Sequence, residues 1–250
     1  MSPASELSVD DEAGRRRVVR NAIAMGLATG AYGLTFGALG VASGLSLAQT
    51  CILSLAMFTG GSQFAFVGVI GGGGTPLAAA ATALLLGARN TVYGLSIGPL
   101  LGVRGWRKAG AAQLVIDEST ATSIGEARQP LARVAFWATG LSIFAFWNLA
   151  TVIGAVAAGA LPDPKALGLD AVAPAAFIFL FAPRLTSRTA WLTAAVGAVV
   201  ALELVPLLPS GLPVIAAAVA VAVLAIVTSR RSPGPEHSAG SGDASWCGWA

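Results

Sequence analysis

Arg89 stands within a long apolar stretch and is the only Asp, Glu, Lys or Arg between Asn21 and Val103. Placing an arginine at the centre of a membrane helix costs about 2.5 to 3.5 kcal/mol on translocon-insertion scales, so a residue of this kind usually has a function. Its planar guanidinium matches the geometry of a carboxylate. We therefore expect Arg89 either to bind an anionic substrate group or to pair permanently with Asp117 or Glu118.

A second group of small and polar residues lies in the preceding apolar segment, at Thr59, Gly60, Gly61, Ser62 and Gln63. Glycine destabilises a helix and polar side chains need partners in hydrocarbon, so this group predicts a break. A helix restarting near Gly61 would turn its free N–H groups and positive dipole end toward a carboxylate. Thr59, Ser62 and Gln63 either contact the substrate too or only hydrogen-bond between helices.

A further break is expected around Gly87–Asn90, next to Arg89. Non-helical backbone at membrane depth is tolerated only when it is buried in protein or lines a cavity, so two successive breaks favour a substrate site, with Asn90 as a candidate contact. Trp147 and Asn148 lie in the middle of a later apolar segment. The aromatic ring there either packs in the core or forms the apolar wall that an aliphatic substrate side chain needs.

The composition excludes an ordinary soluble protein, because 55% of the residues are apolar and only 11% are charged. The formal net charge of +3 comes from basic tracts beside apolar segments, which indicates membrane orientation and no nucleic-acid binding. Cys51 and Cys247 suggest neither a metal site nor a disulfide, and His237 is the only histidine. Without a Ser–His–Asp set or a phosphate-binding loop, we expect no enzyme activity and no cofactor.

The apolar segments that must position these residues recur along the chain, and the longer ones can cross a hydrocarbon layer of about 30 Å. They predict an all-α polytopic membrane protein, an inverted-repeat transporter with about six full spans plus discontinuous or re-entrant half-helices, from about seven or eight segments. The expected segments are Val18–Ala42, Leu47–Ile70, Leu77–Leu101, Ala109–Ala127, Leu131–Ala160, Ala171–Pro183, Thr189–Leu204 and Pro209–Thr228.

Four arginines between positions 15 and 20 should hold the N-terminus in the cytoplasm. The chain then divides into a cytoplasmic segment at 1–17, a transmembrane transporter domain at 18–231 and a disordered cytoplasmic tail at 232–250. The basic tracts lie mostly on the cytoplasmic side, as the positive-inside rule favours, if the segments at 47–74 and 109–127 do not both cross the membrane fully. The alternative is that every segment crosses the membrane. Both alternatives place each terminus inside.

Glycines in and just after the first segment are spaced by four and three residues, at Gly26, Gly30, Gly33, Gly37, Gly40 and Gly44. On one helix this spacing places them on a single face, where a neighbouring backbone can approach closely. We expect this face to pack against another helix; the alternative is direct substrate contact.

Several motifs resemble the AzlC family, the large subunits of bacterial branched-chain amino acid exporters. They are YGLTFG from Tyr32, GLS from Gly44, FTGGSQF from Phe58, ARNTVYGLS from Ala88, and the pair Asp117 and Glu118. The likeness spans about 21–231. It implies export of valine, leucine, isoleucine or methionine across the bacterial inner membrane, often with a small membrane subunit of the AzlD type. It also adds Tyr93, in the Arg-x-x-x-Tyr-Gly signature, to the candidate substrate-binding residues.

Two positions depart from the family pattern, which has Asn or Asp two residues before the arginine and His directly after it. This chain has Gly87 and Asn90 there. Without a titratable His beside Arg89, the case for proton coupling through that position is weakened. Because the acidic pair is retained, Asp117 or Glu118 is the better candidate for the proton carrier.

These observations predict a carrier of small zwitterionic amino acids, embedded in membrane lipid, that works by proton-coupled alternating access. The substrate carboxylate would meet N–H groups near Gly61 and Gln63, with Arg89, and its side chain would lie against Trp147. The alternative from another class is a non-transporting membrane scaffold or assembly subunit whose buried polar pairs are structural.

Overall fold

The computed structural model describes residues 3–160, 178, 182, 185–208 and 212–229. Every regular element in these ranges is a helix, in agreement with the all-helical class expected from the sequence. The expected segment at 171–183 lies almost wholly outside the described residues, as does the tail at 232–250. The helices are α1 (Pro3–Gly30), α2 (Tyr32–Ala42), α3 (Leu47–Ala56), α4 (Gly61–Gly71), α5 (Pro76–Leu101), α6 (Trp106–Gln113), α7 (Asp117–Ile124), α8 (Gln129–Gly159), α10 (Arg188–Leu204) and α11 (Leu212–Ser229).

Local sequence accounts for where several helices begin and end. Ser46 precedes α3; its Oγ accepts a hydrogen bond from the Gln49 N–H at 3.2 Å, and the Gln49 side chain accepts one from the Ser46 N–H at 2.8 Å. Thr75 caps α5 with its side chain in a similar way. α5 ends at Leu101, and the next residue, Gly102, has a φ of +62°, a left-handed conformation that glycine adopts without strain.

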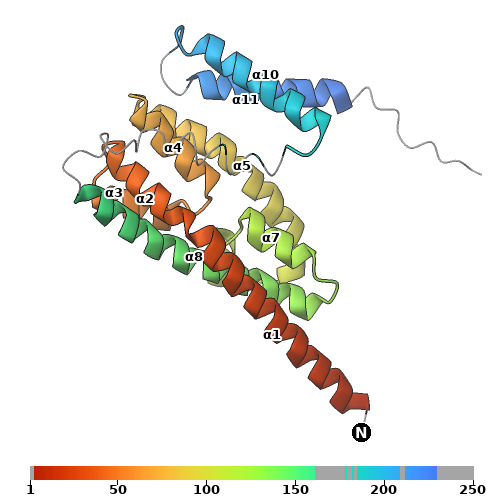
Figure 1. Cartoon of the computed structure of the whole chain (residues 1–250). Coiled ribbons are helices and arrows are strands. Elements are labelled where there is room, and N and C mark those ends of the chain that lie inside the picture. The colour runs from red at the N-terminus through yellow and green to blue at the C-terminus, as the bar shows by residue number, and fades with distance from the viewer. Residues whose placement is uncertain (1–2, 161–177, 179–181, 183–184, 209–211, 230–250) are drawn as a thin grey trace, which may run out of the picture.

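α1 and α2 run along α8 and pack against it (Figure 1). The glycines of α1 and α2 make this contact possible. A Cβ at Gly26 would lie 2.6 Å from the Cβ of Ser142, and one at Gly30 would lie 2.5 Å from the Cβ of Phe146. On α8, Gly154 in turn leaves room for the backbone of Leu34. The expected packing face is therefore present, and it faces α8.

The last glycine of the regularly spaced series does not lie on the helical face. α2 ends at Ala42, so Gly44 lies outside the helix, with a φ of +94° in the turn before α3. A Cβ at Gly40 would meet the side chain of Thr50 in α3. The expectation that Gly44 shares the helical face was wrong, because the chain reverses direction there and uses this glycine for its turn.

The expected segment at 18–42 covers the later part of α1 and all of α2, which are separated only by Ala31, and two other expected segments are interrupted helices. The segment at 47–70 forms α3 and α4 with a break at 57–60, where the sequence predicts one, and the segment at 109–127 forms α6 and α7 with a break at 114–116. The break expected around Gly87–Asn90 was wrong, because α5 is continuous from Pro76 to Leu101. One glycine costs a helix only about 1 kcal/mol relative to alanine, and the alanine and leucine residues before Gly87 outweigh that cost.

Two stretches of described helix, 12–42 and 129–159, are long and apolar enough to cross a membrane. Shorter apolar helices accompany them, among them α3 and α4. Leu77, Leu84 and Leu95 on α5 are 80%, 73% and 75% exposed, and large exposed apolar surfaces mark membrane or protein contacts. These features support a helical membrane protein, while the number of spans stays a prediction.

Candidate functional site

A cavity of about 210 Å³ lies where both breaks meet the long helices. Pockets for drug-sized ligands span roughly 300–1,000 Å³, so this cavity suits a smaller solute. Its wall draws on α1, α2, α4, α5, α7 and α8 and on both breaks. The lining residues are Thr29, Tyr32, Phe58, Thr59, Gly60, Gly61, Leu86, Arg89, Ile116, Asp117, Glu118, Ile143 and Trp147.

The break between α3 and α4 is held by the buried side chain of Gln63. Gly60, just before α4, has φ +63° and ψ −94°, a conformation that strains a residue with a Cβ. Gln63 Oε1 accepts a hydrogen bond from the Gly60 N–H at 3.2 Å, and Nε2 donates to the carbonyl oxygens of Leu53 and Ser54 at 3.4 and 3.3 Å. One amide therefore satisfies backbone groups on both sides of the break.

The break between α6 and α7 is held in the same way by Ser119. Its Oγ accepts a hydrogen bond from the Ile116 N–H at 3.1 Å and donates to the Leu114 carbonyl oxygen at 2.6 Å. Ser119 and Gln63 are each the third residue of their helix, and both are completely buried. The two breaks thus share one local design, in which a buried polar side chain at the third position ties a new helix to the end of the previous one.

Gln113 connects the two breaks. It is the last residue of α6, and its Nε2 donates to the Leu55 carbonyl oxygen near the end of α3 at 2.7 Å. Because Gly61 at the start of α4 and Asp117 at the start of α7 both line the cavity, the two broken helices place their second halves at one site.

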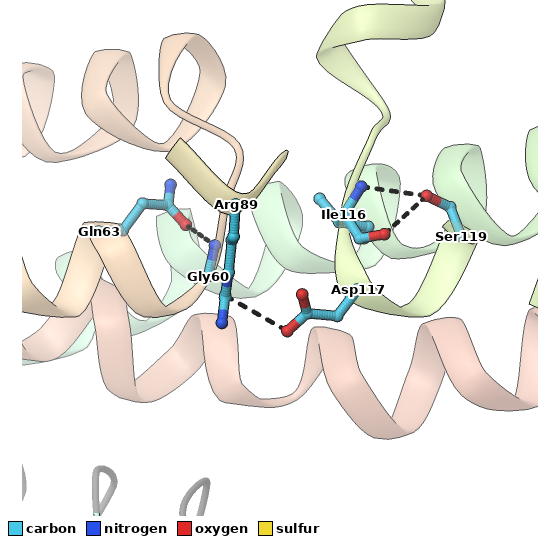
Figure 2. A network of polar contacts seen from close by, with 6 residues as sticks. All are labelled: Gly60, Gln63, Arg89, Ile116, Asp117 and Ser119. Atoms are coloured by element: carbon cyan, nitrogen blue, oxygen red, sulfur yellow. Dashed lines mark hydrogen bonds and ion pairs between the residues drawn. The ribbon is translucent and has the colours of Figure 1, made fainter. Parts of the chain in front are cut away.

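Arg89 lies between these two helix N-termini (Figure 2). Its Nη2 is 3.3 Å from Asp117 Oδ2, and the same nitrogen lies 3.6 Å from the position of a Cβ on Gly61. A charge-assisted N–H···O bond is usually about 2.7–2.9 Å long. The side chains of Arg89 and Asp117 are 36% and 21% exposed. They form a loose ion pair at the cavity wall.

The two helix N-termini differ in charge. The first N–H groups of a helix lack partners within it, and the positive dipole end attracts anions. α7 begins with Asp117 and Glu118, which supply negative charge themselves; among the described residues, no group of three His, Cys, Asp or Glu could hold a metal ion. α4 begins with Gly61 and Ser62, and no side chain caps it through Gly60. Its positive end, beside Arg89, is suited to an external anion.

Buried hydrogen-bond donors around the cavity point to a ligand. Within the part of the chain that the structure describes, Thr59 Oγ1, Arg89 Nε and Trp147 Nε1 have no hydrogen-bond partner. All three residues line the cavity, and Trp147 is only 4% exposed. Leaving such a group unsatisfied costs about 1–3 kcal/mol. A solute that brings acceptor atoms into the cavity would remove this cost.

The remaining wall is apolar and held rigidly. The ring of Phe58 packs edge-to-face on Phe144 with centroids 5.0 Å apart, and Trp147 packs edge-to-face on Phe64 at 6.1 Å. Ile143 lines the cavity one helical turn before Trp147 on α8. These side chains offer fixed apolar surface to an aliphatic group, beside polar groups that would orient its charged end.

Most of the site residues expected from the sequence line the cavity, but some do not. Those that line it are Thr59, Gly60, Gly61, Arg89, Asp117, Glu118 and Trp147. Those outside the lining are Ser62, Gln63, Asn90, Tyr93 and Asn148. Gln63 braces the first break, and Asn148 Nδ2 donates to the Phe144 carbonyl of its own helix at 2.8 Å.

Sequence reasoning missed several lining residues, namely Thr29, Tyr32, Phe58, Leu86, Ile116 and Ile143. Tyr32 and Phe58 each open one of the motifs quoted above, so motif position was a usable signal for these two. The others are ordinary members of apolar segments, and only tertiary structure brings them to the cavity.

We expect Gln63→Leu to destabilise the first break, because leucine leaves the Gly60 N–H and the Leu53 and Ser54 carbonyls without this partner, at about 1–3 kcal/mol per unsatisfied buried group. Thermal unfolding of the purified protein in detergent should move to lower temperature. Gln49→Leu, which removes an exposed capping side chain, is the matched control and should cost far less. An unchanged unfolding temperature for Gln63→Leu would show that the brace is dispensable.

Interrupted apolar helices that meet at a small, partly polar cavity are typical of membrane transport proteins. A model of the AzlC protein family matches residues 24–161, more than half of the chain, and the chain belongs to this family. The matched range is shorter than the 21–231 expected from the motifs. The family is linked to branched-chain amino acid transport. No curated protein and no solved structure gave a significant match.

Proposed function

We propose that the protein transports branched-chain amino acids or methionine out of the bacterial cell, by alternating access around its two broken helices. The observation that carries this proposal is the position of Arg89, which lies in a small cavity between an open helix N-terminus at Gly61 and the acidic N-terminus at Asp117. Family membership supports amino acid transport.

The substrate carboxylate binds at the start of α4. The N–H groups of Gly61 and Ser62 lack partners within the helix, and the guanidinium of Arg89 adds positive charge. The aliphatic side chain lies against Phe58, Ile143 and Trp147, which are ring and branched surfaces of the same cavity. This division into one polar and one apolar half suits an amino acid with an uncharged side chain.

Proton coupling is assigned to the acidic pair Asp117 and Glu118. Both residues line the cavity, and acidic residues at membrane depth commonly form proton pathways. The only histidine, His237, lies in the C-terminal stretch outside the described residues.

The chain is a multi-pass protein of the inner membrane with both termini in the cytoplasm. The basic tract at 15–20 and the two long apolar helices support this placement. At both breaks a buried polar side chain at the third position of the new helix, Gln63 in one and Ser119 in the other, hydrogen-bonds to the chain before it. This repeated local structure supports an inverted repeat. A small membrane subunit of the AzlD type completes the transporter.

The proposal is tested by flux of labelled valine in proteoliposomes that contain the full chain, with and without a co-expressed small membrane subunit. We expect saturable flux that unlabelled leucine, isoleucine and methionine compete with. A non-transporting scaffold or assembly subunit, the alternative function, would give no saturable flux in either preparation. A gene next to this one that encodes about 100 mostly apolar residues, enough for several membrane helices, would supply the subunit for this experiment.

A further inference from the structure

Two of the ion pairs in the described residues differ in geometry. Arg17 on α1 contacts Glu126, between α7 and α8, through two hydrogen bonds of 3.0 and 2.9 Å. Arg89 and Asp117 meet through one nitrogen and one oxygen at 3.3 Å, and no hydrogen bond between them meets the usual geometry. Two-point contact holds an arginine in place, whereas a single long contact is easily replaced.

Arg89, Asp117 and the α4 N-terminus together place positive and negative charge where a zwitterion could bind. On one side of the guanidinium lies the α4 N-terminus with its first N–H groups, which attract a carboxylate. On the other side lies Asp117, which attracts a cation. The Arg89–Asp117 pair therefore presents one positive and one negative group to the cavity, which is the complement of an α-amino acid.

We propose that the substrate binds by opening the Arg89–Asp117 ion pair. One charged group of the substrate then replaces Asp117 as the partner of Arg89, and the other replaces Arg89 as the partner of Asp117. This inference rests on the proposed function. The substrate carboxylate binds Arg89 and the α4 N-terminus, and the substrate ammonium binds Asp117. The exchange conserves the charge of the cavity, since both ions of the pair receive a new partner of the same sign as the old one.

This exchange defines the substrate class as compounds that carry both an ammonium and a carboxylate group on neighbouring atoms. An amine alone would bind Asp117 without bringing a carboxylate to Arg89, and a carboxylic acid alone would bind Arg89 without bringing a cation to Asp117. An ion left without its partner in a partly buried site is strongly unfavourable. The site should therefore reject both fragments.

The exchange also makes a proton and the substrate compete. The ionisable side chains around Asp117 in the cavity are Glu118 on α7, Tyr32 on α2 and Arg89 on α5, while the lining residues from α8 are Ile143 and Trp147. When Asp117 takes up a proton from solution, its carboxyl group no longer pairs with the substrate ammonium. The Asp117 carboxylate therefore holds either the substrate ammonium or a proton, but not both. If it releases the substrate outside and returns with a proton, outward movement of substrate is linked to inward movement of protons.

Binding of three compounds to the purified full-length protein tests the exchange. L-Valine should bind at least about tenfold more tightly than isobutylamine, which lacks the carboxylate, and than 3-methylbutanoate, which lacks the ammonium. If either fragment binds as tightly as valine, transport stands and the ion-pair exchange is wrong. If none of the three binds, the proposed substrate class fails, and the exchange fails with it.

The pH dependence of valine binding separates Asp117 from other acids. As the pH falls, valine affinity should drop, because a proton on Asp117 takes the place that the substrate ammonium needs. Asp117→Asn should bind valine weakly and without this dependence. Glu126→Gln, which breaks the Arg17 pair outside the cavity, should retain the wild-type curve. A wild-type pH curve in Asp117→Asn would overturn the proposal.

Discussion

Replacing Arg89 with alanine is expected to reduce valine flux in proteoliposomes to the level of liposomes without protein. In the part of the chain that the structure describes, Arg89 is the only cationic side chain lining the cavity. Its removal takes away the partner of the substrate carboxylate and also the cation that faces Asp117 at 3.3 Å. Losing one partner of a fully buried pair costs about 3–5 kcal/mol, and less here because the pair is partly exposed.

Two further variants show whether the loss is specific to the cavity. Arg89→Lys keeps the charge but not the planar guanidinium, so flux should fall to an intermediate level. Arg133→Ala is the matched control, because Arg133 also contacts α5, through its Nε to the Leu100 carbonyl at 2.9 Å, but lies outside the cavity. It should retain flux. Wild-type flux in a monodisperse, well-folded Arg89→Ala protein would eliminate Arg89 from the transport mechanism.

The sequence predicts the polar centre of this fold well, because hydrocarbon makes each charge in it costly. Arg89 stands alone over more than eighty positions, and the two acids nearest to it downstream are Asp117 and Glu118. The structure brings all three to one cavity. The break before Gly61 is also predictable, since small and polar residues accumulate there in an otherwise apolar segment.

Other features depend on tertiary contacts and could not be predicted. Gly87 and Asn90 resemble a break signal, yet α5 continues through them. The second break falls at 114–116, where apolar residues surround Val115 and only the side chain of Ser119 marks it. Gln63 looked like a substrate ligand because it is polar and adjacent to the first break, whereas its amide is fully used by the backbone.

Adding one methyl group at Gly37 is expected to disrupt the contact between α2 and α8 and to destabilise the fold strongly. A Cβ on Gly37 would overlap the Thr151 carbonyl oxygen and would lie 2.8 Å from the Ala155 nitrogen. Both are backbone atoms of α8, so they cannot rotate away as a side chain does. Inserting a methylene into a well-packed core costs about 1–3 kcal/mol, and backbone overlap costs more because a whole helix must shift.

Gly37→Ala should therefore yield little monodisperse protein on size-exclusion chromatography in detergent, and the recovered fraction should unfold at a lower temperature than wild type. Gly94→Ala is the matched control: it adds the same methyl group to α5, where no atom beyond the neighbouring helix backbone lies within 4 Å of the new Cβ. Because alanine favours a helix by about 1 kcal/mol over glycine, Gly94→Ala should be at least as stable as wild type. If the two variants behave alike, backbone contact between α2 and α8 does not hold the fold together. If only Gly37→Ala fails, that contact fixes α8, and with it the positions of Ile143 and Trp147 in the cavity wall.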